Sequence, residues 1–202
     1  MKVIIPQDLN EITLGHMMQL ADIEKLEIEE IDKAKLVIKL LVDNVNDDNI
    51  DRIKVTDLLV MYQKLSVMTN TNTSLIKLMV LDGVKYGFNP DIQNISTGEF
   101  MDIDMLCKEM DKNLHQVMAI LYREVTTEGD GKYLIKEYDA KIEDRAKLFK
   151  EKMPASVAQS CLVFFYHLGK DYLRGTMECL KEEQKVKEVL ASVKGGAGIL
   201  SL

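Results

Sequence analysis

Residues 5–20 read IPQDLNEITLGHMMQL, and residues 88–103, 83 positions further along, read FNPDIQNISTGEFMDI. The two stretches align without a gap, and four aligned pairs are identical: Asp8/Asp91, Ile12/Ile95, Gly15/Gly98 and Met18/Met101. Each stretch runs from a polar turn to a Thr or Ser that can cap a helix, and then into a helix with an apolar face. We therefore predict an internal duplication. The alternative is two unrelated helix starts that look alike because Ser and Thr caps favour the same neighbours.

Outside these two stretches, apolar residues recur at helical spacing along most of the chain. The predicted helices cover residues 13–25, 29–44, 57–68, 97–110, 114–124, 142–152, 154–168 and 170–193. Asp82-Gly83 and Gly129-Asp130-Gly131 predict two hairpin turns, because these residues tolerate the positive φ of a type I′ turn. Thr56, Ser96 and Asn113 are the predicted caps of the helices that follow them.

These elements predict a mainly α fold with small β-hairpins (α+β), built from two related helical units and a C-terminal helical pair. The predicted domains are residues 1–72, the first helical repeat unit, and residues 73–153, a hairpin with the second unit. Residues 154–202 form the C-terminal helices and a glycine-hinged tail.

Composition limits the classes of function. The chain has 202 residues, of which 47% are hydrophobic and 29% charged, so it can bury a sizeable core. Lys and Arg total 26 against 33 Asp and Glu, and the formal net charge of −7 disfavours generic binding to nucleic acid or an anionic membrane. The most apolar window, residues 161–166, is too short to span a bilayer. Three widely spaced cysteines do not form a disulfide framework and indicate a reducing cytoplasm.

A search for chemistry yields one weak candidate. Cys107, Asp111 and His115 follow at intervals of four, so one continuous helix would align three metal ligands. A helix break at Asn113 favours the alternative, an ordinary helix surface. Five carboxylates that follow Ser96 are expected to be solvated: Glu99, Asp102, Asp104, Glu109 and Asp111. No nucleophile has a partner base evident in the sequence, so we predict no catalytic residue, no cofactor and no metal, and not an enzyme.

Two apolar segments point to burial or to a partner. Residues 153–169 are apolar nearly all round, which predicts burial in the chain's own core or against another protein. The tail carries Ile199, Leu200 and Leu202 beyond the flexible Gly195-Gly196-Ala197-Gly198. Those three residues are the candidate partner contacts, docking on a neighbouring subunit. Plain disorder is the alternative.

Three stretches taken together resemble a known group of proteins. They are ISTGEFMDI at residues 95–103, MAILYREV at 118–125, and an RA pair at 145–146 followed by MPA at 153–155 and FF at 164–165. This set resembles small proteins encoded in the structural and tail-assembly gene blocks of tailed bacteriophages. The resemblance covers residues 95–169 well and the N-terminal half weakly, and its motifs are structural rather than catalytic. The glycine-hinged tail departs from the pattern.

The resemblance implies a virion structural protein, assembled in the host cytoplasm. Such a protein would be a homo-oligomeric ring or connector in the head–tail region that contacts other virion proteins. It would bind neither specific nucleic acid nor membrane, and the acidic surface would let DNA pass without holding it. One alternative is a tail-assembly chaperone that is absent from the mature particle, and another is an enzyme whose site is dispersed along the chain.

Overall fold

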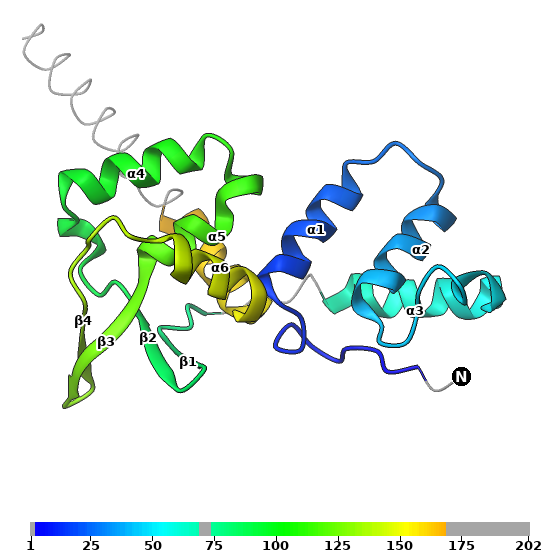
Figure 1. Cartoon of the computed structure of the whole chain (residues 1–202), viewed down its shortest axis with the longest axis horizontal. Coiled ribbons are helices and arrows are strands. Elements are labelled where there is room, and N and C mark those ends of the chain that lie inside the picture. Colours follow the sequence, from blue (N-terminus) through cyan, green and yellow to red (C-terminus); the bar gives the residue numbers. More distant parts are fainter. Residues whose placement is uncertain (1–2, 69–73, 169–202) are drawn as a thin grey trace, which may run out of the picture. The chain divides into compact units, whose positions relative to one another are not determined.

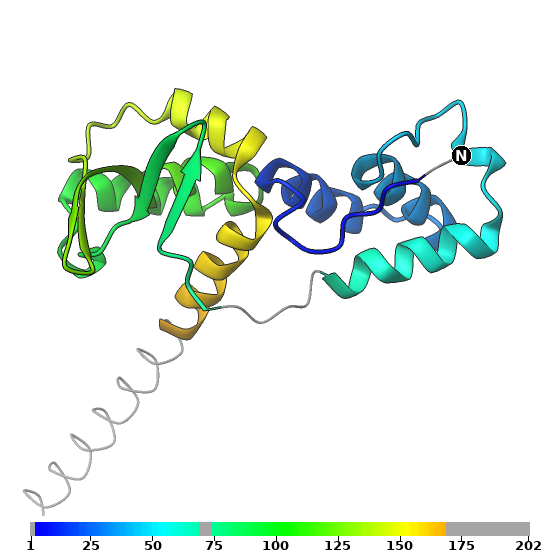
Figure 2. The same ribbon diagram turned by 90° about the horizontal axis from the view of Figure 1, so that it is seen from below.

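The computed structural model describes residues 3–68 and 74–168. The chain divides into two compact units, residues 1–161 and 162–202. The helices of the first unit, drawn in Figures 1 and 2, are α1 (Leu14–Glu24), α2 (Glu30–Leu41), α3 (Val55–Met68), α4 (Thr97–Cys107), α5 (Met110–Leu121) and α6 (Glu143–Lys152). Residues 155–161 are also helical, as are residues 162–168 of the second unit.

Four short strands form one antiparallel sheet in the order β1-β2-β3-β4. Their bounds are β1 (Leu78–Leu81), β2 (Val84–Phe88), β3 (Tyr122–Gly129) and β4 (Lys132–Ile135). Both predicted hairpins are present: Asp82 and Gly83 have φ of 49° and 80°, and Asp130 and Gly131 have φ of 50° and 72°. Positive φ at both central positions is the signature of a type I′ turn. The α+β fold class with small hairpins is therefore confirmed.

The two aligned stretches start helices in the same way. Thr13 and Ser96 each accept a hydrogen bond from the backbone N–H three residues on, at 3.2 Å in both cases. Both α1 and α4 have 11 residues, and the helices that follow, α2 and α5, both have 12. Each second helix ends at an extended residue, Val42 or Tyr122. A duplication would produce all of these likenesses, and it stays a prediction together with the domain bounds built on it.

Three local predictions were wrong. The helix expected over residues 114–124 ends at Leu121, and Tyr122 begins β3, because Tyr122 pairs with Phe88 across the sheet. Asn113 does not cap a helix; it lies inside α5, and its Nδ2 donates to the Leu106 carbonyl at 3.2 Å. Thr56 is not a cap either, since α3 begins one residue before it.

The first unit has a core in each half. In the N-terminal half, buried apolar residues of α2 and α3 pack with the segment before α1: Leu9, Ile12, Ala34, Val37, Ile38, Leu41, Leu58, Met61 and Leu65. In the other half, the ring of Tyr86 on β2 packs edge-on against the ring of Phe149 on α6, and the ring centres are 5.1 Å apart. The predicted burial of the apolar segment in the chain's own core holds for its start, where Ala155, Val157, Ala158 and Cys161 are buried.

Candidate functional site

The residues predicted to contact a partner, Ile199, Leu200 and Leu202, lie outside the described residues, as does the predicted helix 170–193. A candidate site must therefore come from residues 3–68 and 74–168. Four features of these residues are candidates: two exposed apolar helix faces, an apolar pocket and a cluster of polar side chains.

The face of α1 that turns toward α6 shows how closely two helices approach. A Cβ placed on Gly15 would lie 2.6 Å from the Lys150 carbonyl oxygen, so a larger residue cannot occupy this position without a shift. Leu14 donates its backbone N–H to the Met153 carbonyl at 2.7 Å, which joins α1 to the residue that follows α6. Met18, one turn further on, is only 8% exposed. Glycine thus permits the close approach of the α1 and α6 backbones.

An equivalent face lies on α4, but none of the described residues covers it. Gly98 aligns with Gly15, yet nothing lies within 4 Å of a Cβ placed there. Met101 aligns with Met18, yet it is 62% exposed. Met105 extends the row by one turn and is also exposed, whereas the exposed Phe100 lies on another side of the helix. We call the three residues of the row (Gly98, Met101 and Met105) the α4 face.

A second exposed apolar surface lies on α3. This helix buries Leu58, Met61 and Leu65 on one side. The opposite side carries four large apolar residues that are 41–68% exposed: Val55, Leu59, Val60 and Val67. We call this set the α3 face. The exposed polar residues Thr56 and Gln63 lie on the same side of the helix, so the α3 face is apolar in part. Apolar groups that gather on the surface of a soluble protein mark interaction sites more often than isolated ones do.

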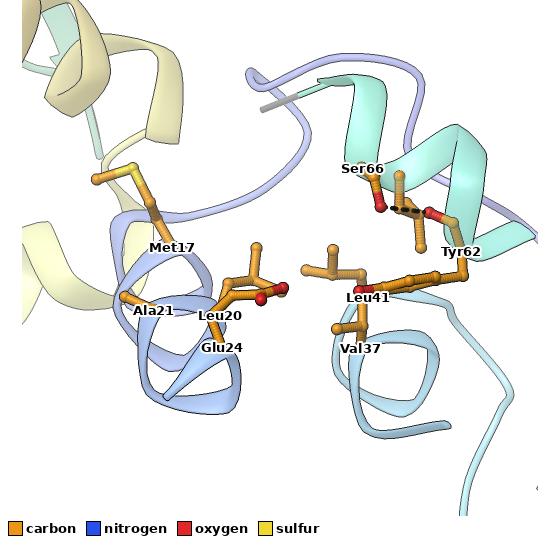
Figure 3. A pocket seen from close by; sticks show the side chains of 9 residues that line it. Met17, Leu20, Ala21, Glu24, Val37, Leu41, Tyr62 and Ser66 are labelled. Atoms are coloured by element: carbon orange, nitrogen blue, oxygen red, sulfur yellow. Dashed lines mark hydrogen bonds between the residues drawn. The ribbon is translucent and has the colours of Figure 1, made fainter. Parts of the chain in front are cut away.

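The apolar pocket lies among α1, α2 and α3 and has a volume of about 320 Å³ (Figure 3). Its lining is mostly aliphatic and aromatic: Met17, Leu20, Ala21, Glu24, Val37, Leu41, Tyr62, Leu65 and Ser66. Burial, together with the nearby charge of Glu24, raises the pKa of the Tyr62 hydroxyl, which therefore stays protonated. Such a pocket suits an apolar side chain, and the Glu24 carboxylate at its lining lies 4.0 Å from Lys33 Nζ of the same chain.

The polar cluster joins α4 to the sheet. Glu99 and Arg123 are 4% and 5% exposed, and Arg123 Nη2 lies 3.3 Å from Glu99 Oε1. Asn89 Nδ2 donates to the same oxygen at 3.2 Å. The Tyr138 hydroxyl donates to Asp102, and burial together with this bond raises the pKa of Tyr138. The guanidinium of Arg123 also lies 5.9 Å from the centre of the Tyr138 ring.

The expected solvation of the carboxylates was thus wrong for Glu99. Its Ser96-x-x-Glu spacing indicated a helix start, and Ser96 does cap α4, but the Glu99 carboxylate is used in the buried ion pair. Nothing in the sequence marked Arg123 as its partner, because Arg123 fell within a predicted helix. This cluster fixes α4 against β3, which is a structural role.

The candidate metal ligands do not share a helix. Cys107 ends α4, whereas Asp111 and His115 lie on α5, and Asp111 forms an ion pair with Lys25. Burial lowers the pKa of the His115 imidazole, and the nearby Lys150 lowers it further. Across residues 3–68 and 74–168, no group of three or more His, Cys, Asp or Glu side chains is placed to hold a metal ion.

Two wider observations complete the survey. Among the described helices, none is long and apolar enough to cross a membrane. Comparison of the chain with protein-family models, with curated proteins and with solved structures finds no match.

Proposed function

We propose that this chain is a non-enzymatic structural protein of a tailed bacteriophage virion. It forms a homo-oligomeric ring or connector in the head–tail region and contacts other virion proteins. The observation that supports this most directly is the pair of exposed apolar faces, on α4 and on α3. Exposed Met, Val and Leu side chains favour burial against another protein, because each Å² of apolar surface removed from water stabilises a complex.

Two further features agree with the proposal. The motifs at residues 95–103 and 118–125 that carry the resemblance coincide with α4 and with the junction of α5 and β3. The formal net charge of −7 suits a protein beside a DNA conduit, since it repels the phosphate backbone.

The test is mass spectrometry of purified particles of the phage that encodes this chain. We expect the protein at a fixed copy number relative to the major capsid protein, and we expect that ratio to survive gradient purification. Its absence from mature particles, while it is abundant in infected cells, would rule out a structural role.

A second candidate function, a tail-assembly chaperone, draws on the pocket among α1, α2 and α3. A chaperone binds an exposed apolar segment of a client and then leaves, and this pocket can receive an apolar side chain. Ala21 lines the pocket yet is itself exposed, so Ala21→Glu should block the pocket without disturbing the core. Under this function, Ala21→Glu abolishes co-purification of a tail protein from infected cells, while the exposed-site control Val80→Glu leaves it unchanged.

A further inference from the structure

We propose that the α4 face of one molecule packs on the α3 face of a second copy of this chain, in a head-to-tail arrangement. This interface rests on the self-association that the proposed function requires, and it identifies the two surfaces involved.

The two aligned helices α1 and α4 differ in how they are covered. The Gly-x-x-Met face of α1 is covered by the same chain, whereas the Gly-x-x-Met face of α4 is covered by none of the described residues.

The α4 face has the shape of a helix-packing surface. Glycine lowers helix stability relative to alanine, and Gly98, in the first turn of α4, has no close contact with another described residue that would require the absence of a side chain. At Gly15 the close approach of the Lys150 backbone accounts for the glycine. Gly98 has no such neighbour among the described residues, and the exposed Met101 and Met105 lie on the same side of α4. The surface is suited to a neighbouring backbone at the same short distance.

The internal relationship of the two halves indicates which element of the second copy fits. The helix that covers the α1 face is α6, which follows α5 in the chain. Under the predicted duplication, α2 occupies the place of α5 in the first half, and the helix that follows α2 is α3. Repeating the α1–α6 contact between molecules therefore brings α4 of one copy onto α3 of the next. The outward side of α3 is apolar and exposed, as this contact requires.

The charges that border the two faces are complementary. Asp104 on α4 precedes Lys108, the residue that follows the helix, and the two exposed side chains form an ion pair at 3.8 Å. On α3, Asp57 precedes Lys64, and both are exposed. An antiparallel packing of the two helices places Asp104 beside Lys64 and Lys108 beside Asp57. A parallel packing would set like charges together, so the charges select the antiparallel orientation.

Because the two faces lie on different helices, each molecule carries one of each and the contact is heterologous. This gives a sharp test with two variants of the full chain. Met101→Glu blocks the α4 face and leaves the α3 face intact, whereas Val60→Glu blocks the α3 face and leaves the α4 face intact. Val80→Glu, at a strand residue that is also 61% exposed, is the matched control.

Masses are measured by analytical ultracentrifugation between 5 and 200 µM, roughly the range of weak to moderate protein affinities. We expect the wild type and Val80→Glu to form species larger than dimers, and each blocked variant alone to be monomeric. An equimolar mixture of the two blocked variants should form a dimer and nothing larger, because only one intact pair of faces remains. Circular dichroism of each variant confirms that it is folded.

Three results would overturn the proposal. The first is a wild type that stays monomeric throughout this range. The second is a mixture of Met101→Glu and Val60→Glu that stays monomeric, which would mean that the two faces do not bind each other. The third is a Met101→Glu variant that loses its fold, which would mean that the rest of the same chain covers the α4 face.

The proposal and the proposed function can fail separately. A protein found at fixed copy number in particles, but monomeric or associating through other surfaces, would leave the function standing and remove this interface. A protein that forms the predicted mixed dimer, but is absent from particles, would leave the interface standing and remove the function.

Discussion

At the scale of the residue, Gly15 and Gly98 are the same amino acid in two environments. Gly15→Ala places a methyl group 2.6 Å from a backbone oxygen that cannot easily move, and we expect it to lower the free energy of unfolding by about 1–3 kcal/mol. Gly98→Ala meets open space and gains helix propensity, so we expect a change between zero and about 1 kcal/mol of added stability. Urea denaturation at low protein concentration measures both. Equal losses in the two variants would contradict this account.

The buried ion pair of Glu99 and Arg123 also makes a prediction at this scale. Arg123→Met leaves the Glu99 carboxylate buried without its partner, and we expect a loss of about 3–5 kcal/mol in the free energy of unfolding. The double variant Glu99→Gln with Arg123→Met removes both charges, so it should be more stable than Arg123→Met alone. Urea denaturation of the wild type and the two variants tests this. A double variant less stable than Arg123→Met would show that charge burial is not the cause.

Single residues also show where sequence reasoning succeeds. Thr13, Ser96 and the Asp-Gly and Gly-Asp-Gly turns act on backbone within three residues of themselves, and all were predicted correctly. Asn113 was misjudged because its amide bonds a carbonyl seven residues away. Glu99 was misjudged because its partner, Arg123, lies 24 residues on in the sequence. Local chemistry is visible in a sequence, whereas pairings made by the fold are not.

At the scale of the element, α1 has a start that depends on pH. Thr13 accepts the His16 backbone N–H, and His16 Nδ1 accepts the Thr13 N–H at 3.3 Å, so the cap needs a neutral imidazole. Burial lowers the pKa of His16, and burial followed by Lys150 lowers that of His115. A folded-state pKa below the unfolded value near 6.5 means that the unfolded chain binds protons first, so stability falls as pH drops below about 6.5.

We therefore expect the free energy of unfolding to decrease between pH 7.5 and pH 5.5. His16→Gln keeps an acceptor at the third helical position but does not titrate, so the slope should be shallower in the double variant His16→Gln, His115→Gln. Thermal or urea unfolding at several pH values in this window checks the prediction. An unchanged slope in the double variant would assign the effect to other groups.

The junction of α5 and β3 shows why element boundaries were harder to predict than elements. Residues 118–121 are buried and helical, and the apolar pattern continues smoothly into Tyr122. Only the pairing of β3 with β2 stops the helix there, and β2 ends 34 residues earlier in the chain. The Tyr122 hydroxyl then donates to the Ile76 carbonyl at 2.7 Å, which holds the segment before β1 as well. A tertiary contact overrides local helix propensity at this point.

At the scale of the whole molecule, the net charge of −7 opposes association of like copies. Added salt screens this repulsion. It also screens the exposed Asp–Lys pairs that border the proposed contact, but such pairs contribute little, and the apolar part of the contact is not weakened by screening. We expect the association constant of the wild type to rise between 50 mM and 500 mM NaCl, as measured by sedimentation equilibrium. A fall over this range would show that ion pairs, rather than apolar burial, dominate the contact.

The sequence predicted the class of fold and both hairpins, but not the surfaces that carry the proposed contact. The residues it favoured as contacts, Ile199, Leu200 and Leu202, lie outside the described residues. The α4 face was overlooked because Met101 reads as an ordinary apolar position of an amphipathic helix. The alignment of Met18 with Met101 could not supply the signal by itself, since the two residues are identical and only the structure shows that one is buried and the other exposed.

The uncovered Gly98 and Met101 also bear on how many copies assemble. Head-to-tail pairing leaves one unmatched α4 face and one unmatched α3 face at the ends of any open row, whatever its length. Only a closed ring has no unmatched face. Burial of apolar surface therefore favours a ring over a longer open row once the two ends of the row can meet. In the ring that we propose, the angle between α3 and α4 of a single chain sets the number of copies. Because α1 lies in the same half as α3 and α6 in the same half as α4, we expect Gly15→Ala, which forces α1 and α6 apart, to change the number of subunits as well as the stability of each one.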